Sequence, residues 1–314
     1  MSSLNNQKQF YSNRLVGLDN YFDDMAMLFE AKKFPKVLLL NGKKGIGKFT
    51  LTMHLINYIF TKKETIPYNA KEKTINLDSF FYNSLLNKTT QDVILIQAEE
   101  NKNIKIDDIR SLKSVLSNSS LSENPRFIII DDVEFLNINS ANALLKTLEE
   151  PSDNNFFILI NNQQADLIET ISSRCLKTNI FLNSIKRNEV IDYLIKFREV
   201  KNLIEFNKKN LSPGQFMSFN SLYLKYKINK KDNILTKLST LISGYKKDKD
   251  KISIGLIYYL IDLSFLDKIQ KNQSKTEFLL DTKASIINIV NDFVQYNLNI
   301  NAVLSTIRIK LNNV

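Results

Sequence analysis

The sequence predicts an α/β domain built on a parallel sheet, followed by two all-helical domains. Two observations lead to this prediction. In residues 1–180, short runs rich in Ile, Val, Leu and Phe alternate with segments of helical periodicity. After Phe181 the strand-like runs stop, and apolar residues recur at spacings of three and four. We therefore expect an α/β domain over residues 1–180, a small helical domain over 181–226 and a larger helical domain over 227–314.

The strands of the predicted sheet are short, and those in the middle of the set lack polar alternation. Such strands are covered by helices on both faces, as in a parallel sheet, because regularly spaced polar residues would otherwise mark a solvent-facing side. Gly and Pro number only 7 and 5, which argues against long flexible linkers between the elements. The predicted strands are Val37–Asn41, Asp92–Gln97, Arg126–Ile130, Phe156–Asn161 and Asn179–Phe181.

Helices are predicted where apolar residues fall on one face and a start or stop signal flanks them. The helix over Asp107–Leu116 has acidic residues available to cap its start, and the helix over Ser140–Glu150 must stop at Pro151. The segments 246–251 and 271–276 are predicted to connect helices in the second half of the chain. The helices predicted there are Asn183–Val200, Lys230–Tyr245, Ser253–Phe265 and Ala284–Tyr296.

Composition excludes several classes of protein. The 314 residues are 43% hydrophobic, which is enough for packed cores, and the longest apolar runs are strand-sized. The polar start of the chain indicates neither a signal peptide nor a membrane anchor, so we expect a cytoplasmic protein. Cys175 and His54 are the only cysteine and histidine, so a zinc site is not expected and no metal ligand is predicted.

The formal net charge of +10 is compatible with a polyanionic partner such as nucleic acid. Lysine is abundant together with Asn and Ile, and that bias can also reflect the base composition of the gene. The charge alone therefore leaves both interpretations open.

The segment from Val37 to Thr50 has the pattern of a phosphate-binding loop: a strand, a glycine-rich turn and a helix. Gly42, Gly45 and Gly47 would let backbone N–H groups curl around an anion at the start of the helix. Lys48 is then placed to reach the β- and γ-phosphates of a nucleotide. The alternative is a structural turn with a solvated lysine, but the flanking strand and helix favour the nucleotide loop and ATP as its ligand.

The residue after Lys48 departs from the pattern. A Ser or Thr is expected there, because its hydroxyl binds Mg²⁺, and this chain has Phe49. Thr50 lies about 100° further round the helix and cannot simply replace it. We therefore expect that the loop can bind a nucleotide but that Mg²⁺-dependent hydrolysis is weak or absent.

A second motif, made of acidic residues, follows the buried run Phe127–Ile130. Asp131 would stand where a carboxylate sits beside Mg²⁺ and the γ-phosphate, and Asp132 takes the position of the usual Glu base, shorter by one methylene. The competing interpretation is that these acids only cap the next helix. The phosphate loop upstream favours the nucleotide site.

Several stretches together resemble the clamp-loader subunits of bacteria, which are members of the AAA+ ATPase family. Asn139–Pro151 is similar to their NAANALLKTLEEPP motif, and Thr170–Cys175 contains their Ser-Arg-Cys motif. The resemblance extends over most of the chain and is strongest from residue 104 to 180. The shorter stretches that share it are Leu15–Gly17, Ile104–Leu112, Phe157–Asn162 and Leu211–Gly214.

The resemblance implies roles for particular residues. Arg174 would act in trans as an arginine finger that completes the ATP site of a neighbouring subunit. A permanently charged guanidinium suits this role because negative charge develops on the phosphates in the transition state. Val16 would lie in the segment that contacts adenine, and Asn161 would lie in the sensor strand. The domain over 181–226 would be the helical lid, and the domain over 227–314 would be the collar that holds subunits together.

Within this family, two kinds of subunit compete: delta prime and the ATP-hydrolysing gamma/tau. Phe49 and Asp132 both depart from an active ATPase, and Gly214 lies where the sensor-2 arginine is expected. The cysteine quartet that many members carry is also missing. These departures favour delta prime. A free-standing AAA+ enzyme, such as a helicase loader, is the alternative of another class, and it would need the Mg²⁺ hydroxyl that is missing after Lys48.

The expected partners follow from the same resemblance. They are the gamma/tau-type and delta-type subunits of the complex and, through the complex, the sliding clamp and primed DNA. Lys105 and Arg110, at the start of the helix over Asp107–Leu116, are the candidates to face the duplex backbone. Without the motif, the simplest interpretation of Arg174 is a structural pair with a carboxylate beside Cys175.

Overall fold

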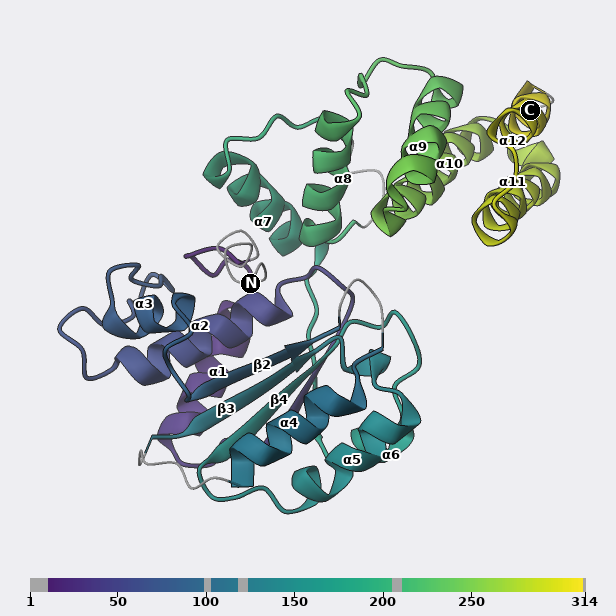
Figure 1. Cartoon of the computed structure of the whole chain (residues 1–314). Helices are drawn as coiled ribbons and strands as arrows, with labels where there is room; N and C mark the ends of the chain where they lie inside the picture. Colours follow the sequence, from purple (N-terminus) through teal and green to yellow (C-terminus); the bar gives the residue numbers. More distant parts are fainter. Residues whose placement is uncertain (1–10, 99–102, 118–123, 205–210, 313–314) are drawn as a thin grey trace. The chain divides into compact units, whose positions relative to one another are not determined.

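The sheet consists of five parallel strands in the order β2-β3-β4-β1-β5 (Figure 1). The structure is a computed structural model, and it describes residues 11–98, 103–117, 124–204 and 211–312. Strands β1, β3 and β4 are central and consist almost entirely of buried residues, whereas β2 and β5 lie at the edges. The strands are β1 Val37–Asn41, β2 Val93–Gln97, β3 Arg126–Asp131, β4 Asn155–Asn161 and β5 Leu176–Asn179.

Both faces of the sheet are covered by helices, as Figure 1 shows. Side chains that alternate along β1, such as Leu38 and Leu39, enter two different cores. One core lies under α1, α2 and α3, and the other lies under α4, α5 and α6. The helices are α1 Asp19–Glu30, α2 Lys48–Thr61, α3 Phe80–Leu86, α4 Ile106–Ser117, α5 Ile138–Glu149 and α6 Glu169–Ser172, with a short 3₁₀ helix η2 at Val133–Phe135.

The chain divides into two compact units. The first is Met1–Tyr193 with Ser212–Gly214, and the second is Leu194–Leu211 with Gln215–Val314, so the division crosses α7 (Ser184–Phe197) and α8 (Pro213–Lys225). In the second unit, neighbouring helices from α9 to α12 pack on one another, and α12 also contacts α9. These helices are α9 Ile234–Asp248, α10 Lys251–Lys271, α11 Thr276–Tyr296 and α12 Ile300–Asn312, with a 3₁₀ helix η3 at Gln273–Lys275.

The predicted α/β class with its parallel sheet and helical C-terminal part is confirmed. The first four strands are found within one residue of their predicted bounds, but the prediction of Asn179–Phe181 for the fifth was wrong, since β5 is Leu176–Asn179. Strand β5 is the edge strand next to β1 and pairs with it from Leu38 opposite Leu176 to Asn41 opposite Asn179. An edge strand with exposed side chains does not need an apolar run, which is why its sequence did not stand out.

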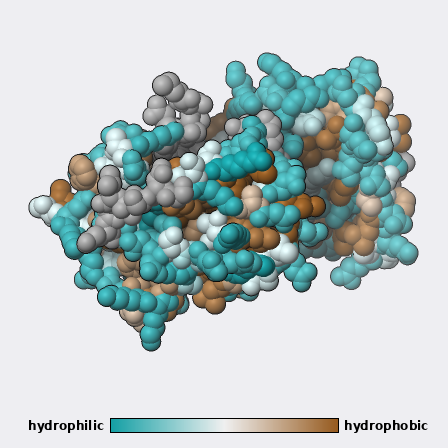
Figure 2. Space-filling view, turned by 60° about the horizontal axis from the view of Figure 1, so that its bottom comes forward, coloured by the Kyte–Doolittle hydropathy of each residue, from teal (hydrophilic) through white to brown (hydrophobic). Residues whose placement is uncertain are grey.

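The surface visible in Figure 2 is mostly hydrophilic, with smaller hydrophobic patches between the polar residues. Large apolar side chains that are more than two-thirds exposed include Phe80, Ile138, Phe181 and Ile185. Among the described residues, no helix is both long enough and apolar enough to cross a membrane.

His54 lies inside the first unit, on α2, and is completely buried. Its Nε2 is 3.0 Å from the carbonyl oxygen of Ser12, so this nitrogen carries the proton and donates it. Its Nδ1 then accepts from the hydroxyl of Tyr68 at 2.9 Å. The neutral ring is thus satisfied on both nitrogens, and burial lowers the pKa of His54 to about 4.

We expect the folded chain to lose stability as the pH falls below about 6.5, where the unfolded histidine takes up a proton and the folded one does not. The loss continues towards pH 4 and amounts to about 3 kcal/mol. Because His54 is the only histidine, its ring resonance in an NMR titration is unambiguous. A midpoint near pH 4 is expected, and a midpoint near 6.5 would contradict the buried neutral ring.

Candidate functional site

The predicted phosphate loop connects the carboxyl end of β1 to the start of α2. Gly47 has φ +103°, a left-handed conformation that favours glycine, and it forms the N-cap of α2 without any side-chain cap. A Cβ on Gly42 would stand 2.6 Å from the carbonyl oxygen of Ile180, so only glycine fits there. Gly45 also has positive φ. The turn therefore has the backbone shape that a phosphate group needs, with free amides at a helix N-terminus.

The side chain of Lys48 folds back into this loop and contacts its backbone. Its side chain is buried, and Nζ donates to the carbonyl oxygens of Gly42 at 2.7 Å and Lys43 at 2.9 Å. Burial lowers the pKa of Lys48 to about 8, against the opposing effect of the carboxylates of Asp131 and Glu134. The two carbonyl acceptors suit the protonated ammonium form of Lys48, the form that a phosphate site requires.

The next two positions do not offer a metal ligand of the expected kind. The ring of Phe49 packs edge-on against Tyr11, with ring centroids 6.0 Å apart, and it joins the core under α1, α2 and α3. Thr50 is half-buried on the same first turn of α2. The residues therefore fit the phosphates of ATP, but Phe49 supplies packing where an Mg²⁺ hydroxyl would stand. Val16, the predicted adenine contact, is half-buried next to Gly17.

The acids at the end of β3 are buried and already bound by the chain. Asn162 donates from Nδ2 to Asp131 Oδ1 at 2.9 Å and to Asp132 Oδ1 at 2.8 Å. Lys44 is 3.4 Å from the Asp132 carboxylate. Burial, together with the charge of Asp132, raises the pKa of Asp131 to about 6.

Glu134 belongs to the same cluster and was missed in the sequence. Its carboxylate is buried and accepts from the backbone amide of Asn162 at 3.0 Å and from that of Gln164 at 3.2 Å. Asn161, which the sequence pointed to, lies in a different contact: its Nδ2 donates to Asn41 Oδ1 at 2.9 Å. The signal that could have identified Asn162 is its place directly after β4, at the edge where β3 also ends.

Arg174 lies just before the amino end of β5, whereas the phosphate loop follows the carboxyl end of β1. The two therefore lie at opposite ends of these parallel strands. Strands β1 and β5 run parallel, and Leu176 pairs with Leu38 at their amino ends, whereas the loop follows Asn41 at the carboxyl end of β1. At about 3.3 Å per residue, the length of β5 separates the backbone of Arg174 from the plane of the loop. The fold therefore does not place Arg174 beside Lys48 of the same chain.

Arg174 is held by polar contacts at the surface, whereas its neighbour Cys175 is partly buried and its thiol donates to the carbonyl oxygen of Ile171 at 3.0 Å. Arg174 Nε donates to Glu149 Oε1 at 2.7 Å, and its Nη1 donates to the carbonyl oxygen of Thr170 at 2.9 Å. Cys175 packs against the core under α4, α5 and α6, and burial raises the pKa of its thiol to about 11. Cys175 is thus a structural thiol that stays protonated.

Lys105 and Arg110 lie at the start of α4. Both are exposed, and Arg110 Nη1 is 3.1 Å from Asp107 on the same helix. Helix α4 belongs to the layer that also contains α5 and α6. The two cations are therefore available at the surface, although Arg110 is shared with an acid.

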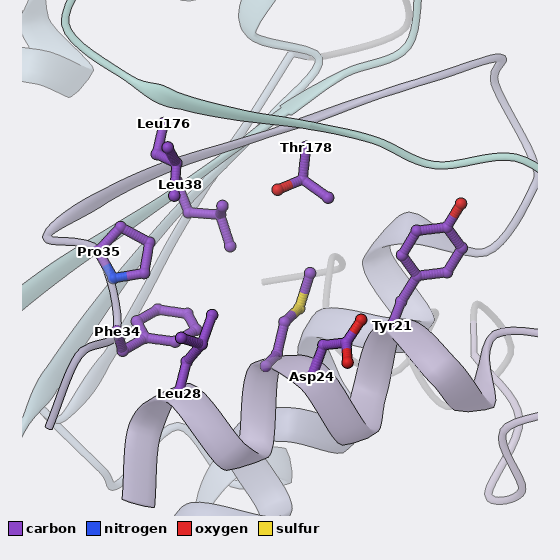
Figure 3. Close-up of a pocket in the computed structure, with 9 residues that line it drawn as sticks. Tyr21, Asp24, Leu28, Phe34, Pro35, Leu38, Leu176 and Thr178 are labelled. Carbon is purple, nitrogen blue, oxygen red and sulfur yellow. The ribbon is translucent and has the colours of Figure 1, made fainter. Parts of the chain in front are cut away.

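A cavity of about 200 Å³, lined by none of these residues, lies between α1 and the edge of the sheet (Figure 3). Its lining is mostly apolar and comes from α1, β1, β5 and the segment before β1: Tyr21, Asp24, Met25, Leu28, Phe34, Pro35, Leu38, Leu176 and Thr178. Within the described ranges, no group of three or more His, Cys, Asp or Glu residues is arranged to hold a metal ion.

Comparison with known proteins assigns the class. Residues 18–183 match the family described as DNA polymerase III, delta subunit. This region is more than half of the chain, so the chain belongs to that family, and with it to the clamp-loader proteins expected from the motifs.

Relatives include more than one kind of subunit. The delta-prime subunit of Pseudomonas aeruginosa is 32% identical over 141 residues, covering 44% of this chain and 41% of that one. The tau subunit of Bacillus subtilis is 30% identical over 161 residues, 51% of this chain and 27% of that one. The gamma subunit of Buchnera aphidicola from Acyrthosiphon pisum is 26% identical over 260 residues, 80% and 65% respectively. The matched region spans less than two thirds of each relative.

The predicted resemblance to the delta-prime subunit is confirmed by these matches. Among solved structures, a gamma subunit-related protein of Thermotoga maritima aligns with a TM-score of 0.48 and 18% identity, covering 91% of this chain and 96% of that one.

Proposed function

We propose that this chain is a delta-prime-type subunit of the DNA polymerase III clamp loader. In this role it donates Arg174 to the ATP site of a neighbouring gamma/tau-type subunit and hydrolyses little or no ATP itself. Its partners are the gamma/tau-type and delta-type subunits and, through the complex, the sliding clamp and primed DNA. The segments 181–226 and 227–314 serve as the lid and the collar of the subunit.

The observation that carries the proposal is the separation of Arg174 from the chain's own loop across the length of β5. A guanidinium on the edge opposite to Lys48 can complete a phosphate site only if that site belongs to another chain. The side chain is 31% exposed, so it can be reached from outside. Its charge is permanent, as stabilisation of a phosphoryl-transfer transition state requires.

The expectation of weak hydrolysis is supported by two features of the loop region. Phe49 packs on Tyr11 and offers no hydroxyl to Mg²⁺. Asp132, at the position of the base, is buried and held by Asn162 and Lys44. A base must be free to accept a proton from water, and each of these contacts opposes that.

The first prediction from this proposal concerns nucleotide binding by the isolated chain. ATP affinity should be the same with Mg²⁺ as with EDTA, and turnover should be near zero, because no hydroxyl coordinates the metal. Calorimetry and a phosphate-release assay measure the two quantities. Phe49→Thr should introduce Mg²⁺ dependence, whereas Phe49→Leu, which keeps the packing and adds no hydroxyl, should not. Turnover of the wild-type chain comparable to that of the gamma/tau subunit would move the assignment to the gamma/tau type.

The second prediction concerns Arg174→Ala in the reconstituted complex with its gamma/tau and delta partners. Turnover at the site that Arg174 completes should fall about 10³-fold, the scale typical of arginine fingers, and clamp loading should fail. Arg174→Lys should not restore the rate, since an ammonium lacks the planar fork. Size-exclusion chromatography and circular dichroism check assembly and folding. Wild-type ATPase in a complex that contains Arg174→Ala would refute the finger.

The third prediction concerns DNA. We propose that Lys105 and Arg110 face the phosphate backbone of the primed duplex. The double charge reversal Lys105→Glu/Arg110→Glu should weaken DNA binding by the complex and lower the slope of log affinity against log salt by about 2. The matched control reverses Lys33 and Lys88, which are exposed on the side of α1 and α3. Equal slopes for the two variants would count against a DNA contact at α4.

A further inference from the structure

Glu149 holds the guanidinium of Arg174 from the side. It is the last residue of α5, and its Oε1 accepts from Arg174 Nε at 2.7 Å and also contacts Nη2. On the other side of the guanidinium, Nη1 donates to the carbonyl oxygen of Thr170 at 2.9 Å and to the hydroxyl of Ser173 at 3.3 Å. Three residues from two elements therefore fix the plane of the group.

The N–H groups of Arg174 that these contacts leave unused show on which side the guanidinium can bind a further group. A guanidinium has five N–H groups: one on Nε and two on each terminal nitrogen. The contacts to Glu149 use the Nε donor and one Nη2 donor, and the contacts to Thr170 and Ser173 use those of Nη1. Among the described residues, the second Nη2 donor has no partner, and it lies at the end of the side chain.

The pair is poorly placed to act as a stabilising contact. Glu149 and Arg174 are 46% and 31% exposed, and ion pairs this accessible are weakened by water and salt. Glu149 also lies in the last turn of α5, where the partial negative charge of the helix end disfavours a carboxylate. What the contact does supply is a fixed orientation for a long side chain that would otherwise sample many rotamers.

We propose that Glu149 is a positioning residue for Arg174. It holds the guanidinium side-on, so that the unused end faces the phosphate of a nucleotide bound to the neighbouring subunit. The inference rests on the proposed function of Arg174 as a trans finger. It adds that the finger is pre-oriented by its own chain before the subunits meet, which lowers the entropy lost when it engages. Figure 1 shows α5, which ends at Glu149, and α6, which ends two residues before Arg174, side by side on one face of the sheet.

The experiment uses the reconstituted complex with primed DNA and clamp, and it compares Glu149→Gln with Glu150→Gln. The two substitutions remove the same charge from adjacent exposed positions, but only Glu149 contacts Arg174. Glu149→Gln should lower kcat for ATP about tenfold at the site that Arg174 completes while leaving KM unchanged within about twofold, the pattern of an interaction made in the transition state. Glu150→Gln should behave as wild type, and the melting temperature of each isolated variant should be unchanged.

A double variant separates positioning from a structural effect. If Glu149 acts only through Arg174, then Glu149→Gln combined with Arg174→Ala should be no slower than Arg174→Ala alone. Additive losses would overturn the proposal, as would a rate for Glu149→Gln equal to or above that of wild type. The outcomes are also distinct from failure of the proposed function. Wild-type activity of Arg174→Ala refutes the finger itself, whereas an impaired Arg174→Ala beside an unimpaired Glu149→Gln refutes only the positioning role.

Discussion

The parallel pairing of β5 with β1 is the constraint on which the chemistry of this chain depends. Parallel strands put all their carboxyl ends at one edge of a sheet and all their amino ends at the other. The loop with Lys48 follows β1, Asp131 ends β3 and Asp132 comes directly after it, so they share one edge. Arg174 precedes β5 and therefore lies at the other edge. No rotamer of a single side chain can undo that separation, and this supports the proposal that Arg174 serves the nucleotide site of another chain.

At the carboxyl edge, the chain satisfies its own buried polar groups. Asn162 bridges Asp131 and Asp132, and Glu134 accepts the buried backbone amide of Asn162 and the part-buried amide of Gln164. Leaving such groups without partners costs free energy, so the contacts help to keep the edge folded. The same contacts restrain the carboxylates that hydrolysis would have to use. One arrangement thus stabilises the edge and supports the proposal that hydrolysis is weak.

A part of the fold or of the site could be predicted from the sequence where the residues that form it are close together in the chain. It could not be predicted where folding brings distant residues together. The strand-turn-helix of the phosphate loop was predictable because its glycines and Lys48 are contiguous. A carboxylate partner for Arg174 was one of the interpretations left open, but Glu149 could not be singled out, because the contact joins two segments 25 residues apart through side-chain geometry. Strand β5 was misplaced because an edge strand carries little hydrophobic pattern, and its register is set by β1. The interpretation of Asn161 as the sensor rested on motif position, whereas Asn162 is the asparagine that touches both acids.

The difference between what a motif indicates and which contacts the folded chain makes also applies to the phosphate loop. The sequence left two interpretations of Lys48 open, a nucleotide ligand and a solvated turn lysine. The structure differs from the solvated lysine, since the side chain is buried. Its Nζ satisfies the carbonyl oxygens of Gly42 and Lys43, so the lysine also stabilises the turn from within. A loop whose lysine has this second role keeps its shape even where hydrolysis is weak. The motif is therefore good support for the fold and only indirect support for catalysis, which is why the functional assignment depends more on Arg174 than on Lys48.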